Sequence, residues 1–146
     1  IQNVWTFRRE LWDHRWWDYR FTLNLFERSL TVLEEGMSTK GYEVPESREP
    51  KVKSMRRVLE LLKNNREDNY IVRAEEELGE IQNSGGWFEG EEDTPAQRKH
   101  NRKVFVRARQ IEQDEWKELW SILEGTRHYK KLGAEYDGSD MRGWWD

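Results

Sequence analysis

The stretch WDHRWWDYRFTLNLFERSLTVLEE, residues 12–35, decides the fold of this chain. Its apolar residues recur at alternating spacings of four and three residues, which is the pattern of a helix with one buried face. Because the stripe extends back to Trp5, the sequence predicts one long helix over about residues 4–35, ended by Gly36. The members of this stripe are Trp12, Trp16, Tyr19, Leu23, Phe26, Leu30 and Leu33.

The first half of this predicted helix is apolar on more than one side. Phe7, Leu11, Trp17 and Phe21 lie off the main stripe, so one neighbouring helix cannot cover all of the apolar side chains. We therefore expect the aromatic rings to be buried between helices or between copies of the chain, and the protein to be a homo-oligomer.

A second long helix is predicted after a linker over residues 36–50, which contains two Gly and two Pro. This helix covers residues 51–82, because Pro50 suits the first helical position. The polar run KNNREDN, residues 63–69, interrupts its apolar spacing, which leaves open one helix with a stutter or two helices that meet there. We favour the continuous form. The apolar positions are Val52, Met55, Leu59, Leu62, Ile71, Ala74, Leu78 and Ile81.

The last predicted helix covers residues 95–124 and follows a Gly-rich acidic loop over residues 83–93. Thr94 and Gln97 have the spacing of a capping box, and Gly125 suits the end of the helix. The tail over residues 125–146 is irregular and closes on two Trp and an Asp. The residues expected inside are Phe105, Ala108, Ile111, Leu119, Ile122 and Leu123.

Together these elements predict an all-α fold. We expect a single helical domain over residues 1–146, an antiparallel bundle of three or four helices with a long first helix and an irregular C-terminal tail. Charged residues make up 37% of the chain and the mean hydropathy is -1.13, but nine Trp, five Tyr and five Phe supply large apolar surfaces for a core. We therefore expect one cooperative folding unit.

Charge, cysteine content and hydropathy limit the classes of function. The net charge of -4 at pH 7 argues against binding to duplex nucleic acid, which normally needs a basic surface. The absence of cysteine excludes disulfides and thiolate metal sites. No apolar run approaches the length of about 20 residues that crosses a membrane, so we expect no membrane partner. Because the chain begins with Ile1, we also expect a short segment before it.

Aromatic and basic residues alternate in the opening stretch and could form a binding surface. Trp and Arg dominate the energetic centres of protein interfaces, and the same pair can stack a nucleotide base and hold its phosphate. The plainer interpretation is that most of these rings belong to the core, with the Arg stems lying across them. The candidate residues for binding a ligand or partner are Arg8, Arg15, Trp16, Trp17, Arg20, Trp144 and Trp145.

An acidic cluster offers an alternative function. EEELGEI, residues 75–81, is similar to the first metal-binding motif of the MazG-like nucleoside triphosphate pyrophosphohydrolases, all-α enzymes that hold Mg²⁺ between facing helices. The expected ExxD partner motif is missing, because the last helix offers only Glu residues at that spacing. A solvated helix face is the plainer interpretation, and we expect no cofactor unless this alternative holds. The metal ligands would be Glu76, Glu77, Glu80, Glu112 and Glu115.

Several short stretches resemble a group of small all-helical proteins of unknown function from tailed bacteriophages. The similar stretches are residues 12–30, 51–62, 67–70 and 113–123 and the closing Trp-Trp-Asp, residues 144–146. This resemblance implies a phage origin and a location in the host cytoplasm or the virion, and it carries over no activity. Phages use proteins of this size as virion parts, as inhibitors of host machinery and as binders of host nucleotide signals.

These observations favour a non-enzymatic phage accessory protein. We expect it to bind a host protein or a small anionic nucleotide through an aromatic and Arg-rich helical surface, in an anti-defence or host-takeover role. The two alternatives are the Mg²⁺-dependent pyrophosphohydrolase and a structural component of the virion.

Overall fold

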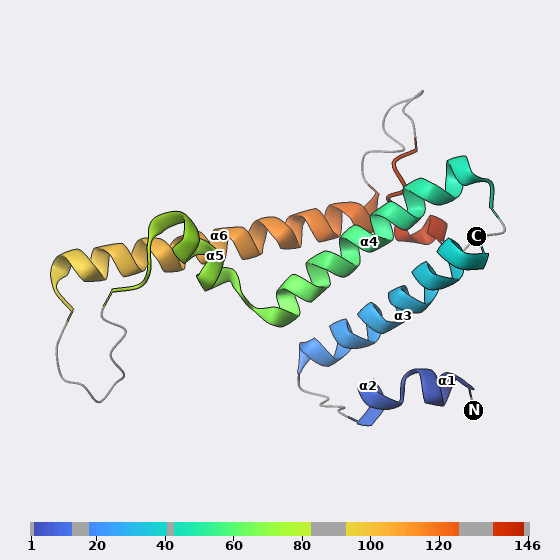
Figure 1. Ribbon diagram of the computed structural model, residues 1–146, viewed down its shortest axis with the longest axis horizontal. Coiled ribbons are helices and arrows are strands. Elements are labelled where there is room, and N and C mark those ends of the chain that lie inside the picture. The colour runs from blue at the N-terminus through green and yellow to red at the C-terminus, as the bar shows by residue number, and fades with distance from the viewer. Residues whose placement is uncertain (1, 13–17, 41–42, 83–92, 126–135, 145–146) are drawn as a thin grey trace. The chain divides into compact units, whose positions relative to one another are not determined.

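The structure is a computed structural model that describes residues 2–12, 18–40, 43–82, 93–125 and 136–144 (Figure 1). Every regular element in these ranges is a helix, so the predicted all-α class is confirmed. The chain divides into two compact units, residues 1–66 with 119–146 and residues 67–118, which are described separately. The elements are α1 (Gln2–Thr6), α2 (Arg8–Trp12), α3 (Tyr19–Lys40), α4 (Pro45–Glu67), α5 (Tyr70–Leu78), α6 (Pro95–Glu124) and the 3-10 helix η1 (Met141–Trp144).

In the first unit, α3 and α4 form an antiparallel pair (Figure 1). Arg66 at the end of α4 reaches Glu27 near the start of α3 at 2.8 Å, whereas Arg56 reaches Glu34 further along α3 at 2.7 Å. Apolar side chains of α3, α4, the end of α6 and η1 make the core of this unit. The buried apolar residues are Leu30, Val52, Met55, Val58, Leu61, Leu62, Leu119, Leu123 and Trp144.

The C-terminal tail, which belongs to the first unit, packs onto α4 and the end of α6 through backbone and side-chain hydrogen bonds. The Asp140 amide donates to the Ile122 carbonyl at 2.9 Å, and the Ser54 hydroxyl donates to the Asp137 carbonyl at 3.0 Å. The described part of the predicted irregular tail is therefore an ordered strap across α4 and the end of α6.

In the second unit, α5 and the first part of α6 are also antiparallel. Arg73 pairs with Glu115 and the later Glu77 pairs with the earlier Arg107, at 2.8 and 2.6 Å. The small core of this unit consists of Tyr70, Ala74, Val104, Ala108 and Ile111, with Ile81 packed against it.

The predicted helix over residues 4–35 is wrong in its boundaries. Within the described residues the helix is broken at Phe7, between α1 and α2, and α3 begins only at Tyr19. Asp18 starts this new helix, because its carboxylate accepts a hydrogen bond from the Arg20 amide at 2.9 Å, as an N-cap does. At the other end α3 continues through Gly36 to Lys40, because a Gly inside a helix costs only about 1 kcal/mol and packing can offset it.

The predicted continuous helix over residues 51–82 is also wrong. It begins earlier, at Pro45, so that Pro50 lies inside α4, and it breaks between Glu67 and Tyr70. The break is at Asp68, whose φ of 53° is left-handed and cannot continue a right-handed helix. The polar run supplies no apolar contact that would compensate for straightening the chain there.

The predicted helix over residues 95–124 coincides with α6, and both of its end signals are observed. The Thr94 amide donates to Gln97 Oε1 at 2.7 Å, and the Gln97 amide donates to Thr94 Oγ1 at 3.3 Å. These two bonds are the predicted capping box. At the other end Gly125 has a φ of 64°, the left-handed conformation expected after a helix.

Candidate functional site

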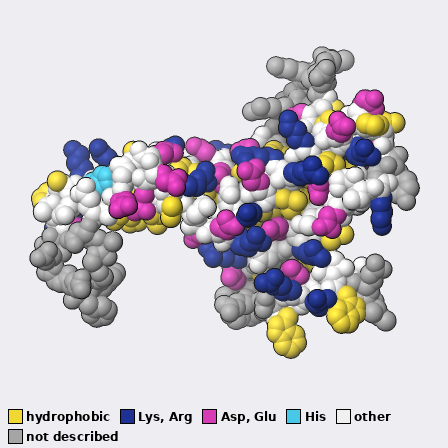
Figure 2. Space-filling model, viewed as in Figure 1, with side chains coloured by type: hydrophobic (Ala, Val, Ile, Leu, Met, Phe, Trp, Pro, Cys, Tyr) yellow, Lys and Arg dark blue, Asp and Glu magenta, His cyan; other side chains and the backbone are white. Residues whose placement is uncertain are grey.

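Three strongly exposed aromatic side chains lie towards the N-terminal end of the first unit. Trp5 is 63% exposed, Trp12 90% and Tyr19 60%, and we call these three residues the aromatic strip. Figure 2 shows large hydrophobic side chains projecting from the surface over α1 and α2. Val4 and Leu11 are exposed beside the strip. The predicted burial of these rings within the chain is therefore wrong, because the described helices α1 and α2 do not cover them.

Basic side chains accompany the aromatic strip. The Arg8 guanidinium lies 5.2 Å from the centre of the Trp5 ring, within the range of a cation–π interaction. Arg20 is exposed at the start of α3, one residue after Tyr19. Two of the predicted binding residues, Arg8 and Arg20, thus lie next to exposed rings.

The other predicted binding residues are not part of this surface as described. Arg15, Trp16, Trp17 and Trp145 fall outside the described residues. Trp144 is only 2% exposed, and its indole N–H donates to the Gly138 carbonyl at 2.6 Å. Its role as a binding residue is therefore corrected, because its ring fills the core of the first unit.

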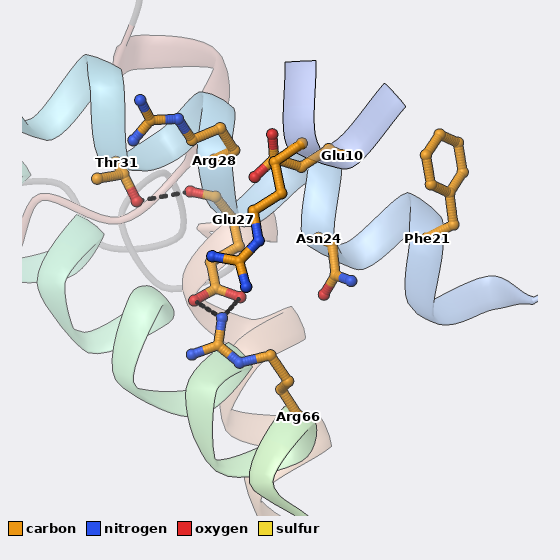
Figure 3. A pocket seen from close by; sticks show the side chains of 8 residues that line it. Glu10, Phe21, Asn24, Glu27, Arg28, Thr31 and Arg66 are labelled. Atoms are coloured by element: carbon orange, nitrogen blue, oxygen red, sulfur yellow. Dashed lines mark hydrogen bonds and ion pairs between the residues drawn. The ribbon is translucent and has the colours of Figure 1, made fainter. Parts of the chain in front are cut away.

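A polar cavity of about 550 Å³ lies in the first unit between α2, α3 and α4 (Figure 3). In Figure 3 the Phe21 ring points away from the group of polar side chains, so polar atoms dominate the interior. The lining residues are Arg9, Glu10, Phe21, Asn24, Glu27, Arg28, Thr31 and Arg66.

Of the three arginines that line the cavity, Arg66 is neutralised by an ion pair and Arg28 is not. Nη1 of Arg66 donates to both carboxylate oxygens of Glu27 at 2.8 Å, the contact drawn in Figure 3. Nε of Arg28 donates instead to the uncharged Thr6 carbonyl at 3.3 Å. The positive charge of Arg28 is thus not balanced by an ion pair with any residue that the structure describes.

The acidic residues of the second unit are bound to arginines. Glu77 accepts two hydrogen bonds from Arg107, at 2.6 and 3.1 Å, and these bonds hold the pKa of the Glu77 carboxyl below its ordinary value. Glu115, which is 12% exposed, pairs with Arg73 at 2.8 Å. The two carboxylates that a shared metal ion would require therefore each face a guanidinium.

The remaining predicted metal ligands are spread over both helices of this unit. Glu76 and Glu80 are exposed at the end of α5 and just beyond it, and Glu112 is half-buried on α6. Among the described residues no group of three or more acidic, His or Cys side chains is arranged to hold a metal ion. The geometry described here gives the pyrophosphohydrolase interpretation no support.

Sequence reasoning missed most of the cavity. Arg9 and Phe21 belong to the aromatic and basic opening stretch that the sequence indicates as a binding surface. Arg28 and Arg66 lie on helices whose sequences have an ordinary amphipathic pattern. The spacing of Asn24, Glu27, Arg28 and Thr31 puts them on one helix face, yet nothing local shows which helix that face meets. Only the pairing of α3 with α4 identifies them as one site.

The fold and these surfaces define an all-α protein with an exposed aromatic strip and a polar, Arg-rich cavity. No described helix combines the length and the apolar character needed to cross a membrane. The chain matches no protein-family model, no curated protein and no solved structure.

Proposed function

We propose that this chain is a non-enzymatic accessory protein of a tailed bacteriophage that acts in the host cytoplasm. It docks its aromatic strip onto an acidic surface of a host protein, in an anti-defence or host-takeover role. The observation that carries the proposal is the exposure of Trp5 on α1, Trp12 on α2 and Tyr19 at the start of α3. The phage origin rests on the resemblance of the stretches around residues 12–30 and 144–146.

The exposed rings favour a protein partner, because removing large apolar rings from water lowers the free energy of a complex. Burying one large apolar side chain stabilises by about 1.5–3 kcal/mol, so Trp5 and Trp12 together would contribute about 3–6 kcal/mol to docking. A micromolar complex needs about 8 kcal/mol, and association has its own entropic cost. The two rings are therefore insufficient without charged contacts.

The charges beside the strip favour an acidic partner. Arg8 and Arg20 are exposed next to the rings, whereas the chain as a whole carries a net charge of -4. Guanidinium groups bind carboxylates with two parallel hydrogen bonds and also stack on aromatic rings. An acidic surface would meet both requirements, and binding would weaken as salt concentration rises.

Site-specific photo-crosslinking tests the proposal. A benzophenone side chain replaces Trp12, and the control replaces Trp120, which is equally aromatic and 60% exposed on α6. We expect a host protein to be crosslinked from position 12 and not from position 120. The purified pair should then show an affinity that falls at least tenfold in Trp12→Ser and changes less than twofold in Trp120→Ser.

The same experiment distinguishes a host protein from the other partners that could bind the aromatic strip. Crosslinks between copies of the chain, together with a dimer in sedimentation, would assign the strip to the homo-oligomer that the sequence predicts. Large assemblies would favour the virion component. Binding of the purified partner that is equal in Trp12→Ser and in the unaltered chain would overturn the proposal.

A further inference from the structure

The cavity between α2, α3 and α4 contains opposite charges that the fold itself leaves uncompensated. The Arg9 guanidinium makes no hydrogen bond or ion pair with another described residue, and Arg28 bonds only to the neutral Thr6 carbonyl. Both guanidiniums line the cavity. A guanidinium binds phosphate and carboxylate groups more strongly than it binds a neutral carbonyl. Each of these guanidiniums is therefore suited to bind an anionic group in the cavity.

Glu10, in contrast, requires a hydrogen-bond donor. Its Oε2 atom is buried and accepts no hydrogen bond within the described structure. A buried carboxylate oxygen without a donor costs about 1–3 kcal/mol or more, so such atoms in native proteins normally have a partner. Because Glu10 also lines the cavity, a ligand with an N–H group could supply the missing donor.

The two remaining charges of the cavity compensate each other. Arg66 and Glu27 form an ion pair that joins α4 to α3, with the Glu27 carboxylate only 17% exposed. This pair holds the two helices that form the walls, and Figure 3 shows it beneath Glu10 and beside Asn24. The uncompensated groups are thus one carboxylate oxygen and two guanidiniums on a wall that the ion pair stabilises.

We propose that this cavity binds a small molecule that carries a phosphate or carboxylate group together with an N–H donor. The anionic group would lie against Arg9 and Arg28, and the donor would reach Oε2 of Glu10. The volume of about 550 Å³ is within the range of about 300–1,000 Å³ of small-molecule sites. Nucleoside monophosphates and free amino acids both have this chemistry.

Calorimetric titration of the full chain distinguishes these two sources. The probes are guanosine and adenosine 5′-monophosphate, L-glutamate and, as an anion without an N–H donor, inorganic phosphate. We expect at least one probe with an N–H donor to bind at least tenfold more tightly than inorganic phosphate. The probe that binds identifies the source of the ligand. No heat from any probe at millimolar concentration would overturn the proposal.

Two substitutions test the two halves of the site. Arg9→Gln removes a guanidinium without breaking a hydrogen bond or ion pair with a described residue, and it should weaken binding of the probe at least tenfold. Glu10→Gln should reduce the preference for that probe over inorganic phosphate to less than threefold. The matched control is Arg102→Gln, the same change on the exposed surface of α6, which should alter affinity less than twofold.

The result is independent of the docking proposed above. Docking is tested at Trp12, whereas this site is tested at Arg9 and Glu10, so either proposal can fail alone. Circular dichroism of each variant establishes that it folds. Unchanged probe affinity in a folded Arg9→Gln variant would show that the cavity is not an anion site.

Discussion

Single residues hold the C-terminal tail against α4, and a close backbone contact constrains Gly138 in particular. Its φ is 80°, and a Cβ atom added there would overlap the backbone carbonyl of Pro50. The same residue offers its own carbonyl to the buried indole of Trp144. The close approach of two backbones at this point requires a residue without a side chain.

We therefore predict that Gly138→Ala lowers the free energy of unfolding by about 2–4 kcal/mol. The reason is that the tail must move away from α4 or accept a strained conformation. Gly36→Ala is the matched control, because a Cβ atom at Gly36 would have no neighbour within 4 Å and the residue lies inside α3. That control should stabilise by about 0.5–1 kcal/mol. Urea denaturation measures both, and equal stability of the two variants would contradict the tail contact.

A second residue-scale feature is the ion pair between Glu43 and Lys51. Lys51 is 7% exposed, and its Nζ lies 2.8 Å from the Glu43 carboxylate, which also accepts a hydrogen bond from Ser47. The bond from Lys51 lowers the pKa of the Glu43 carboxyl below its ordinary value. The carboxylate is thus more acidic in the folded chain than in the unfolded chain.

This shift predicts a pH-dependent contribution to stability. A carboxyl with a lowered folded pKa stabilises fully above its ordinary value of about 4.5 and loses this effect as pH falls through the folded pKa. Glu43→Gln should therefore cost about 1–2 kcal/mol at pH 7, where it leaves Lys51 without its counter-charge, and progressively less as pH falls below about 4.5. Thermal unfolding between pH 3 and pH 7 checks this, with Glu60→Gln at an exposed pair as the control. A loss that is independent of pH would contradict the assigned cause.

At the scale of whole helices, α6 begins where local chemistry alone places it. The side chains of Thr94 and Gln97 each accept a hydrogen bond from the other residue's amide, and Pro95 has no amide hydrogen to satisfy. We predict that Thr94→Ala and Gln97→Ala each cost about 1 kcal/mol. Because the two bonds are reciprocal, the double variant should cost less than the sum of the single variants. Chemical denaturation of all three variants measures this coupling, and strict additivity would mean that the box does not act as a unit.

Which face of a helix is buried depends on contacts that a local sequence pattern does not contain. The sequence predicts Phe105 inside α6, yet it is 50% exposed and the neighbouring Val104 is buried instead. Likewise Ile71 is 41% exposed while Tyr70 is buried. In both cases the residues are predicted correctly to be helical, but the rotation of the helix is set by the opposite helix. The sequence predicts Ala74, Ala108 and Ile111 in the core of the second unit, whereas Tyr70 and Val104 follow only from the pairing of α5 with α6.

The two candidate sites likewise differ in how much of them the sequence alone predicts. The exposed aromatic strip was visible in the sequence as an excess of rings around residues 5–21, although the sequence suggested that the chain would bury them. The cavity was not visible, because Arg9, Arg28 and Arg66 come from three helices and no spacing relates them. Sites on one helix can be predicted from periodicity, whereas sites between helices require the packing.

At the scale of the whole molecule, the two compact units share the helix α6. Its residues up to Glu118 belong to the second unit and those from Leu119 belong to the first. If the second unit opened alone, α6 would have to break in its interior, where helix propagation favours continuity. The single cooperative unit that the sequence predicts therefore depends on α6 remaining one continuous helix.

We predict that substitutions in either core destabilise both units together. Val58 and Val104 are each 0% exposed, one in each unit, so Val58→Ala and Val104→Ala should each cost about 2 kcal/mol. Amide hydrogen exchange reports the two units separately, through the protected amides of α4 and α5. For a cooperative chain, both variants should accelerate exchange in both helices by the same factor, about 30-fold for a loss of 2 kcal/mol. If Val104→Ala accelerated exchange in α5 alone, the units would unfold independently and α6 would divide at their boundary.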